Sequence, residues 1–429
     1  MPAPVPRAAL VKRGALGIAL LAGALFTAAL LAQGAAPVAA PPAASADGIA
    51  LAPAEAAAVT TPSAADAWGG ERRGTEPTLS DRVVDYDIAA TLDPIRHTID
   101  GKQKLRWRNR SAREVKSVYL HLYMNAFESA GSTYHTESRA HGLGGLPGDG
   151  EWGHIALRRV AQDGATVPWT FVHPDGGPAL DHTVVRFDLP APVGAGASTT
   201  LDIDFHTQLP RVINRTGYFG SFHLAGQWFP KIGVLELPGE RGATEVRWNV
   251  HEFHPESEFY ADFGHFDVRL SVPADYIVGA TGERQGAPQV HGRMLTHHFV
   301  QGDVHDFAFT ADNRSAPPME DSWSGPGSPT VNIRVIYPPE YRASAAPALK
   351  AAKDSLDYFS RTLGPYPYRS LTIVIPPYNA EQAGGMEYPT FFTAAGYRSV
   401  TPRTMDAYDL DFVTIHEFGH GYFYGILAS

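Results

Sequence analysis

The stretch Val84-Asp85-Tyr86-Asp87-Ile88-Ala89-Ala90-Thr91-Leu92 places an apolar side chain at every second position. Successive side chains of a β-strand point to opposite faces of a sheet, so this alternation predicts a strand with one buried face. The pattern recurs in residues 104–108, 118–122, 201–205, 266–272 and 331–335. Because no helical pattern separates these segments, residues 79–339 are predicted to form an antiparallel β-saddle or sandwich.

The hydrophobic period changes near residue 340. Apolar residues spaced three and four apart predict an amphipathic helix: Leu349, Ala352, Leu356, Phe359 and Leu363. Residues 371–375 then predict a short strand, and residues 405–425 predict a final helix. The chain is therefore predicted to be a multidomain α+β protein, with residues 340–429 forming a second domain.

Composition restricts the chemistry available to this chain. Its 429 residues carry 45 Asp and Glu against 35 Lys and Arg, a net charge of −10. A nucleic-acid-binding surface needs the opposite balance, so nucleic acid is not an expected partner. The chain has no cysteine, which excludes disulfides, cysteine nucleophiles and thiolate metal sites. A metal would have to be bound by histidine and carboxylate side chains.

The N-terminus has the pattern of an export signal. Arg7, Lys12 and Arg13 precede an uncharged, Ala- and Leu-rich run at residues 14–32, and Ala44-Ser45-Ala46 is an acceptable cleavage site. Residues 1–46 are predicted to be a signal peptide, with a retained signal anchor, attached to a membrane through residues 14–32, as the alternative. The protein is expected to be exported: periplasmic, extracellular or membrane-anchored. Residues 47–78, rich in Ala and Pro, are predicted to be a linker.

The final helix contains His416-Glu417-Phe418-Gly419-His420, an H-E-x-x-H motif. Residues four apart lie one turn above each other, so His416 and His420 can bind one zinc ion. Glu417 lies about 100° further round the helix, where it can accept a proton from an attacking water as a general base. Two surface histidines are the alternative, but Ile415, Phe418 and Phe423 favour a packed helix. A third ligand is required, and a carboxylate is expected.

Two further histidine clusters stand in the predicted β region. His251 and His254 lie in a segment without helical period, and the adjacent His297 and His298 would point to opposite faces of a strand. Both clusters are predicted to be ordinary polar residues rather than metal ligands.

The H-E-x-x-H motif, together with Gly384-Gly385-Met386-Glu387-Tyr388, resembles the aminopeptidase N family of zinc metallopeptidases (gluzincins). Gln227-Trp228-Phe229-Pro230 and Val278-Gly279-Ala280-Thr281-Gly282 resemble exported bacterial members. The resemblance implies a β-saddle followed by a thermolysin-like catalytic domain. It further implies one zinc ion per full-length chain and peptide substrates with a free N-terminus. Residues 384–388 are called the glycine loop. Its residues Gly384, Gly385, Met386 and Glu387 would bind substrate, and Glu387 would bind the α-amine.

The sequence departs from the family pattern in two places. Tyr388 stands where the family usually has Asn, which would affect amine recognition or substrate preference. The family's third ligand, a glutamate, would fall at position 439, beyond Ser429. We therefore expect this chain to be an N-terminal fragment of an aminopeptidase, with an incomplete catalytic domain and no turnover of its own. The alternatives are a thermolysin-like endopeptidase, or a non-catalytic exported β-sandwich binding module with a vestigial metal helix.

Overall fold

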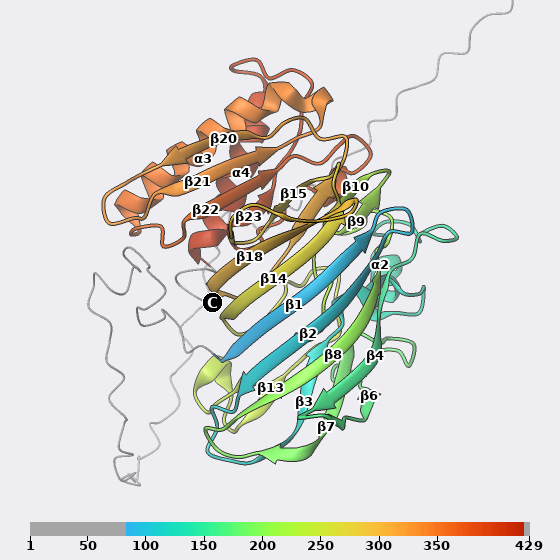
Figure 1. Ribbon diagram of the computed structural model, residues 1–429. Helices are drawn as coiled ribbons and strands as arrows, with labels where there is room; N and C mark the ends of the chain where they lie inside the picture. The colour runs from blue at the N-terminus through green and yellow to red at the C-terminus, as the bar shows by residue number, and fades with distance from the viewer. Residues whose placement is uncertain (1–82, 424–429) are drawn as a thin grey trace, which may run out of the picture. The chain divides into compact units, whose positions relative to one another are not determined.

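The computed structural model describes residues 83–423, which belong to one compact unit (Figure 1). The predicted signal or anchor and the predicted linker lie outside the described residues. Within residues 83–423, no helix is both long and apolar enough to cross a membrane.

The alternating stretch that begins at Val84 forms β1 (Val84–Asp93). Its even-numbered residues are buried, while its odd-numbered residues are more exposed. It lies in the middle of the largest sheet, which has nine strands (Figure 1). In spatial order they are β16 (Glu283–Arg284), β18 (Met294–Val304), β14 (Gly264–Pro273), β1, β2 (Thr98–Arg108), β8 (Ser198–Gln208), β4 (His154–Gln162) and β5 (Ala165–Thr166), with β17 (Gln289–His291) beside β18.

The prediction of a purely antiparallel sheet is wrong at one pairing, because β1 runs parallel to β14, with Val84 opposite Gly264. Side-chain alternation specifies which face of a strand is buried and carries no information about the direction of its neighbour. The prediction also missed one helix of this region, α2 (Thr133–Ala140), which Ser132 caps by accepting a hydrogen bond from the His135 amide.

Three smaller sheets complete the β-rich region. The first contains β15 (Ile277–Ala280), β19 (Phe309–Asp312), β10 (Phe222–Ala225) and β9 (Gly217–Phe219). The second contains β11 (Lys231–Ile232), β3 (Val115–His121), β7 (Val184–Val193) and β6 (Trp169–Phe171). The third is the pair β12 (Val234–Glu236) and β13 (Arg247–Asn249).

The Gln227–Pro230 segment runs through the core and leads to a buried ion pair. Lys231 Nζ lies 2.7 Å from Asp306 Oδ2, and the two side chains are only 1% and 2% exposed. Lys231 also donates to Gln227 Oε1 at 2.8 Å, while the Gln227 amide donates to Asp306. The buried charges are therefore paired and hydrogen-bonded, as a low-dielectric interior requires.

The fifth sheet and two helices form the part of the chain that carries the H-E-x-x-H motif. The strands are β20 (Met319–Trp323), β21 (Val331–Ile336), β22 (Ser370–Val374) and β23 (Phe391–Thr393). The predicted helices are confirmed as α3 (Arg342–Thr362) and α4 (Met405–Phe423), and they pack together through rings of Phe359, Phe418 and Tyr422. Since β21 pairs with β22 in parallel, this sheet begins ahead of residue 340.

Candidate metal and substrate-binding site

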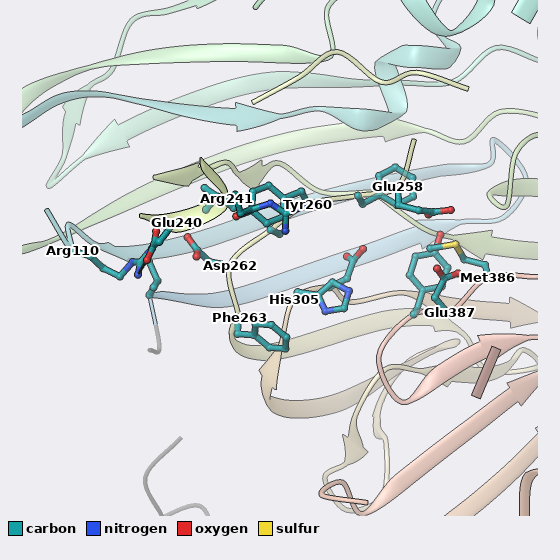
Figure 2. Close-up of a pocket in the computed structure, with 16 residues that line it drawn as sticks. Arg110, Glu240, Arg241, Glu258, Tyr260, Asp262, Phe263, His305, Met386 and Glu387 are labelled. Atoms are coloured by element: carbon teal, nitrogen blue, oxygen red, sulfur yellow. Dashed lines mark hydrogen bonds and ion pairs between the residues drawn. The ribbon is translucent and has the colours of Figure 1, made fainter. Parts of the chain in front are cut away.

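A cavity of about 700 Å³ lies between the glycine loop and the β-rich region. Figure 2 shows Glu258, Met386 and Glu387 at one end of it, and Arg110 and Glu240 at the other. Aromatic side chains also line it: Phe259, Tyr260, Phe263 and Tyr388. The cavity therefore combines apolar walls with carboxylates, among them Glu240 at one end and Glu258 and Glu387 at the other, as is common for ligand pockets.

The glycine loop is held beside α4 by hydrogen bonds to β23. The Gly385 amide donates to the Thr393 carbonyl at 3.0 Å, and the Thr393 amide donates to the Met386 carbonyl at 2.9 Å. Gly385 has a φ of +70°, and a Cβ there would lie 3.6 Å from Glu417 Oε1. Glycine thus lets the loop adopt a left-handed turn directly over the motif glutamate.

Helix α4 brings the two predicted metal ligands together. His416 Nε2 and His420 Nε2 lie 3.1 Å apart. Two nitrogens bound to one tetrahedral zinc at about 2.0–2.1 Å would be separated by about 3.3 Å, so the imidazoles are close to the required spacing. Partial burial holds the pKa of both histidines below the ordinary value, which favours the neutral form that binds metal.

Glu417 lies on the buried side of the same helix and is 7% exposed. Its Oε2 atom is buried without a hydrogen-bond partner among the described residues. Burial, followed by repulsion from Glu387, raises the pKa of Glu417 to about 8. A buried acceptor without a partner indicates a missing ligand or solvent molecule at this position.

The packing of α4 differs from the sequence-based prediction in one respect. Phe418 is 2% exposed, as expected, but Ile415 and Phe423 are 42% and 49% exposed. The buried face instead follows Leu410, Thr414 and Phe418, because only one side of the helix meets α3 and β23. The helix is packed, although two of the three apolar residues used to predict its packing lie on its exposed face.

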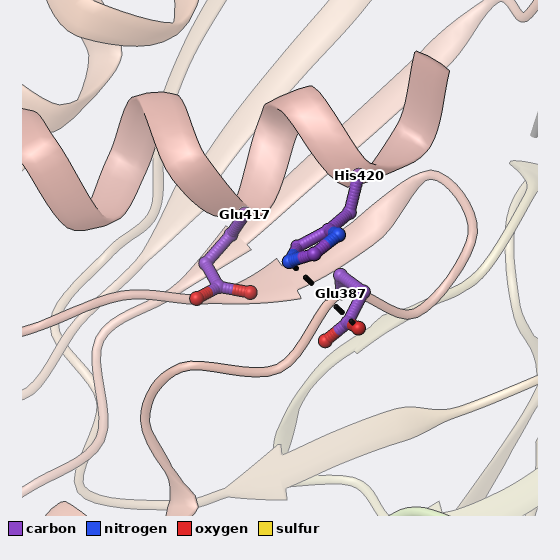
Figure 3. A group of neighbouring side chains, drawn as sticks. All are labelled: Glu387, Glu417 and His420. Atoms are coloured by element: carbon purple, nitrogen blue, oxygen red, sulfur yellow. Dashed lines mark ion pairs between the residues drawn. The ribbon is translucent and has the colours of Figure 1, made fainter. Parts of the chain in front are cut away.

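Glu387 approaches the motif from the glycine loop. Ligand atoms of Glu387, Glu417 and His420 all lie within 4.8 Å of one another (Figure 3). Glu387 Oε1 lies 4.0 Å from His420 Nε2, which is longer than two ligands of one small cation require. The spacing therefore favours His416 and His420 as the metal-binding pair over a set that includes Glu387.

The environment of Glu387 disfavours its charge. Burial, followed by repulsion from Glu258, raises the pKa of Glu387 to about 7, while Arg215 acts in the opposite direction. A cation placed beside Glu387 would therefore be attracted strongly, because the carboxylate is desolvated and lies near other acids.

The donor set fits zinc on chemical grounds. Two neutral imidazoles with suitable spacing, a buried carboxylate without a partner and no cysteine anywhere in the chain suit a His–carboxylate site. Within residues 83–423, Glu387, Glu417 and His420 form the one group of three or more His or carboxylate side chains whose ligand atoms all lie within 4.8 Å of one another.

Two residues of the site were not predicted from the sequence. Arg215 and Glu258 come from the β-rich region, and Arg215 Nη1 donates to Glu258 Oε1 at 2.8 Å. Arg215 Nη1 also lies 3.6 Å from the sulfur of Met386. Neither residue belongs to a recognisable motif, and only long-range folding brings them next to the glycine loop.

Tyr388, the departure from the family's asparagine, is 3% exposed. Its hydroxyl donates to the Arg215 carbonyl at 3.4 Å. A Cβ at Gly226 would lie 1.7 Å from that hydroxyl, so the tyrosine fills the space that glycine leaves open. The side chain therefore joins the glycine loop to the β-rich region.

The other histidine clusters form hydrogen bonds with carboxylates. His251 Nδ1 lies 2.7 Å from Asp175 Oδ1, and His254 Nδ1 lies 2.8 Å from Glu137 Oε2. His297 is 6% exposed, whereas the side chain of His298 is 36% exposed and contacts Asp267 at 2.8 Å. The two adjacent histidines thus occupy opposite faces of β18, as strand geometry requires.

No protein-family model matches the chain, and no curated protein matches it. Several solved structures do match the chain. A two-domain M1 zinc metallopeptidase, in a glutamate-to-alanine mutant bound to L-tryptophan, aligns with a TM-score of 0.50 at 17% identity. The same kind of mutant bound to L-arginine aligns with a TM-score of 0.50 at 18% identity. An M1 zinc metallopeptidase from Deinococcus radiodurans aligns with a TM-score of 0.47 at 18% identity.

Each alignment covers 81% of this chain and 66% of the other, so the chain spans about two thirds of the length of these structures. At such identities the similarity concerns the fold. The chain has the fold of the M1 zinc metallopeptidases over most of its length, and this supports the resemblance to the aminopeptidase N family that its motifs carry.

Proposed function

We propose that the whole protein is an exported zinc aminopeptidase that removes N-terminal residues from peptides. The observation that carries the proposal is the meeting of two sequence motifs in space: Glu387 lies 4.0 Å from His420, although the two residues are 33 positions apart in the chain. An H-E-x-x-H helix alone would support any metallopeptidase. A buried glutamate facing it from the cavity side favours recognition of a substrate's ammonium group.

In this proposal His416 and His420 hold zinc, which, when bound, would supply Lewis-acid activation of water and of the scissile carbonyl. Glu417 accepts the proton of the attacking water on a carboxylate oxygen and passes it to the leaving amine. Its pKa is raised to about 8 by burial, and a nearby dication would favour the ionised form that accepts a proton.

Glu387 binds the free α-ammonium of the substrate and thereby fixes the scissile bond one residue from the N-terminus. Gly385 and Met386 already pair with Thr393 of β23 and so extend this sheet by one short segment. An extended substrate would add to the outer edge of residues 384–386. The cavity beyond Met386 and Glu387 is large enough for a side chain. The amino acids bound in the two similar structures are the products that such an enzyme would release.

The test uses the whole protein with unblocked and N-acetylated aminoacyl substrates. We expect hydrolysis of the unblocked substrate only, one zinc per chain, and a loss of at least about 100-fold in kcat for Glu417→Gln. Cleavage of blocked peptides at internal bonds would instead indicate an endopeptidase, and full activity in Glu417→Gln would refute the mechanism.

A further inference from the structure

We propose that Arg215 is a positioning residue that clamps the glycine loop against the β-rich region and so sets the place of Glu387. The proposal rests on the proposed function only for its kinetic test. Its structural basis is independent of that function, because it lies in the conformation and contacts of Arg215 itself.

The backbone of Arg215 is held in an unfavourable conformation. Asn214 and Arg215 have φ values of +39° and +68°. They are the two central residues of a tight turn, in which the Ile213 amide donates to the Thr216 carbonyl at 2.9 Å. Such turns prefer glycine at the second central position, and a side chain there costs free energy. Backbone strain that persists in a folded protein often marks a functional position.

Arg215 makes three contacts with one short segment, residues 382–388. Its amide donates to the Gln382 carbonyl at 2.8 Å, and its carbonyl accepts from the Tyr388 hydroxyl at 3.4 Å. Its guanidinium lies 3.6 Å from the Met386 sulfur. The two contacts with Met386 and Tyr388 flank Glu387 on both sides, so a movement of Arg215 would move the carboxylate.

The same guanidinium holds a second wall of the cavity. It donates to Glu258 at 2.8 Å, and Glu258 lines the cavity end that contains Met386 and Glu387. Arg215 therefore bridges the two segments between which a substrate would lie. Its side chain is 25% exposed, so its contacts are partly shielded from solvent.

Tyr388 completes the clamp. The hydroxyl of Thr216, the neighbour of Arg215, accepts a hydrogen bond from the Gly226 amide at 3.2 Å. Gly226 has no side chain and so leaves the space that the Tyr388 hydroxyl occupies. Contacts thus link Thr216, which follows Arg215, to Gly226, and Gly226 to Tyr388. The Tyr388 hydroxyl then donates back to the Arg215 carbonyl and closes the ring of contacts. This ring gives a role to the tyrosine that replaces the family's asparagine.

The decisive variant is Arg215→Gly, because glycine suits the turn and keeps the backbone contacts with Gln382 and Tyr388. Only the guanidinium contacts with Glu258 and Met386 are lost. A purely structural arginine and a positioning arginine then predict different results. The matched control is Arg211→Gly, four residues earlier, whose side chain is 46% exposed and pairs with Glu151 outside the site. Both variants remove one positive charge and add one glycine. Arg215→Lys tests whether charge alone restores the effect.

The first measurement is hydrogen exchange in the 429-residue chain. We expect the amides of residues 384–388 to exchange at least about tenfold faster in Arg215→Gly, with a thermal midpoint within about 3 °C of the parent. Arg211→Gly should leave this exchange unchanged. Unchanged exchange in Arg215→Gly, or the same acceleration in both variants, would overturn the proposal. If Arg215→Gly unfolds, the same comparison is made with Arg215→Lys.

The second measurement is made with the whole protein. Displacing Glu387 should raise KM for unblocked aminoacyl substrates about 10- to 100-fold with a smaller change in kcat, and Arg215→Lys should recover part of it. Unaltered KM in Arg215→Gly would overturn the positioning role. Absence of aminopeptidase activity in the parent protein would refute the proposed function, while the exchange result would still decide whether Arg215 clamps the loop.

Discussion

Replacing Lys231 with methionine would leave a carboxylate in the core without its cation. Lys231 and Asp306 are 1% and 2% exposed and lie 2.7 Å apart, and the ammonium also lies 5.7–5.9 Å from the rings of Phe229, Tyr123 and Phe259. In Lys231→Met, the Asp306 carboxylate would keep its hydrogen bonds from the Gln227 side-chain amide and from the Phe307 backbone amide, the latter at 2.8 Å. Neither donor neutralises the charge.

Breaking a buried ion pair from one side costs about 3–5 kcal/mol, whereas replacing both charges is often close to neutral. We therefore expect Lys231→Met to lose about 3–5 kcal/mol of unfolding free energy. The double variant Lys231→Met with Asp306→Asn should lose no more than about 2 kcal/mol, because no buried charge remains. The coupling energy between the two sites should exceed about 2 kcal/mol.

Guanidinium unfolding, followed by tryptophan fluorescence, is a suitable assay because Trp228 is completely buried in the same segment. The matched control is Lys353→Met, which removes a surface lysine whose side chain is 35% exposed and pairs with Asp321, and it should cost less than about 1 kcal/mol. Equal losses in Lys231→Met and in the double variant would refute the argument, because the cost would then come from packing and not from an unpaired charge.

Three further predictions concern the site and the pH dependence of stability. Gly385→Ala should destabilise the glycine loop by about 1–2 kcal/mol, because its φ is +70°, and hydrogen exchange at residues 384–388 should accelerate; unchanged exchange would contradict the strained turn. Burial lowers the pKa of His121 to about 3 and of His223 to about 4. Both are therefore neutral in the folded protein at a pH where the unfolded chain is already protonated. The contribution of these neutral histidines to the unfolding free energy is fully present above about pH 6.5 and is lost as pH falls toward 4. The loss is up to about 1.4 kcal/mol per pH unit for each histidine. His223→Gln should therefore make the unfolding free energy fall less steeply with decreasing pH. Finally, a chelator should abolish aminopeptidase activity in the whole protein, and added zinc should restore it. Retained activity in the chelated enzyme would contradict a zinc site.

The fold was predictable where local patterns decide it. Alternation along Val84–Leu92 predicted β1 with the correct buried face, and the change to a helical period predicted α3 and α4. The parallel pairing of β1 with β14 was not predictable, because these strands are separated by most of the β-rich region. Strand direction in a sheet depends on how the chain returns, which local periodicity does not specify.

The candidate site likewise has a part that the sequence predicted and a part that it did not. One turn of helix places His416 above His420, so the sequence alone determined that their imidazoles converge, and the structure places their Nε2 atoms 3.1 Å apart. Only the tertiary structure decided that Glu387 faces them, that Arg215 and Glu258 flank the loop, and that Tyr388 is buried over Gly226. The reason is physical: contacts within one helical turn follow from backbone geometry, whereas contacts between distant segments depend on which buried faces pack together.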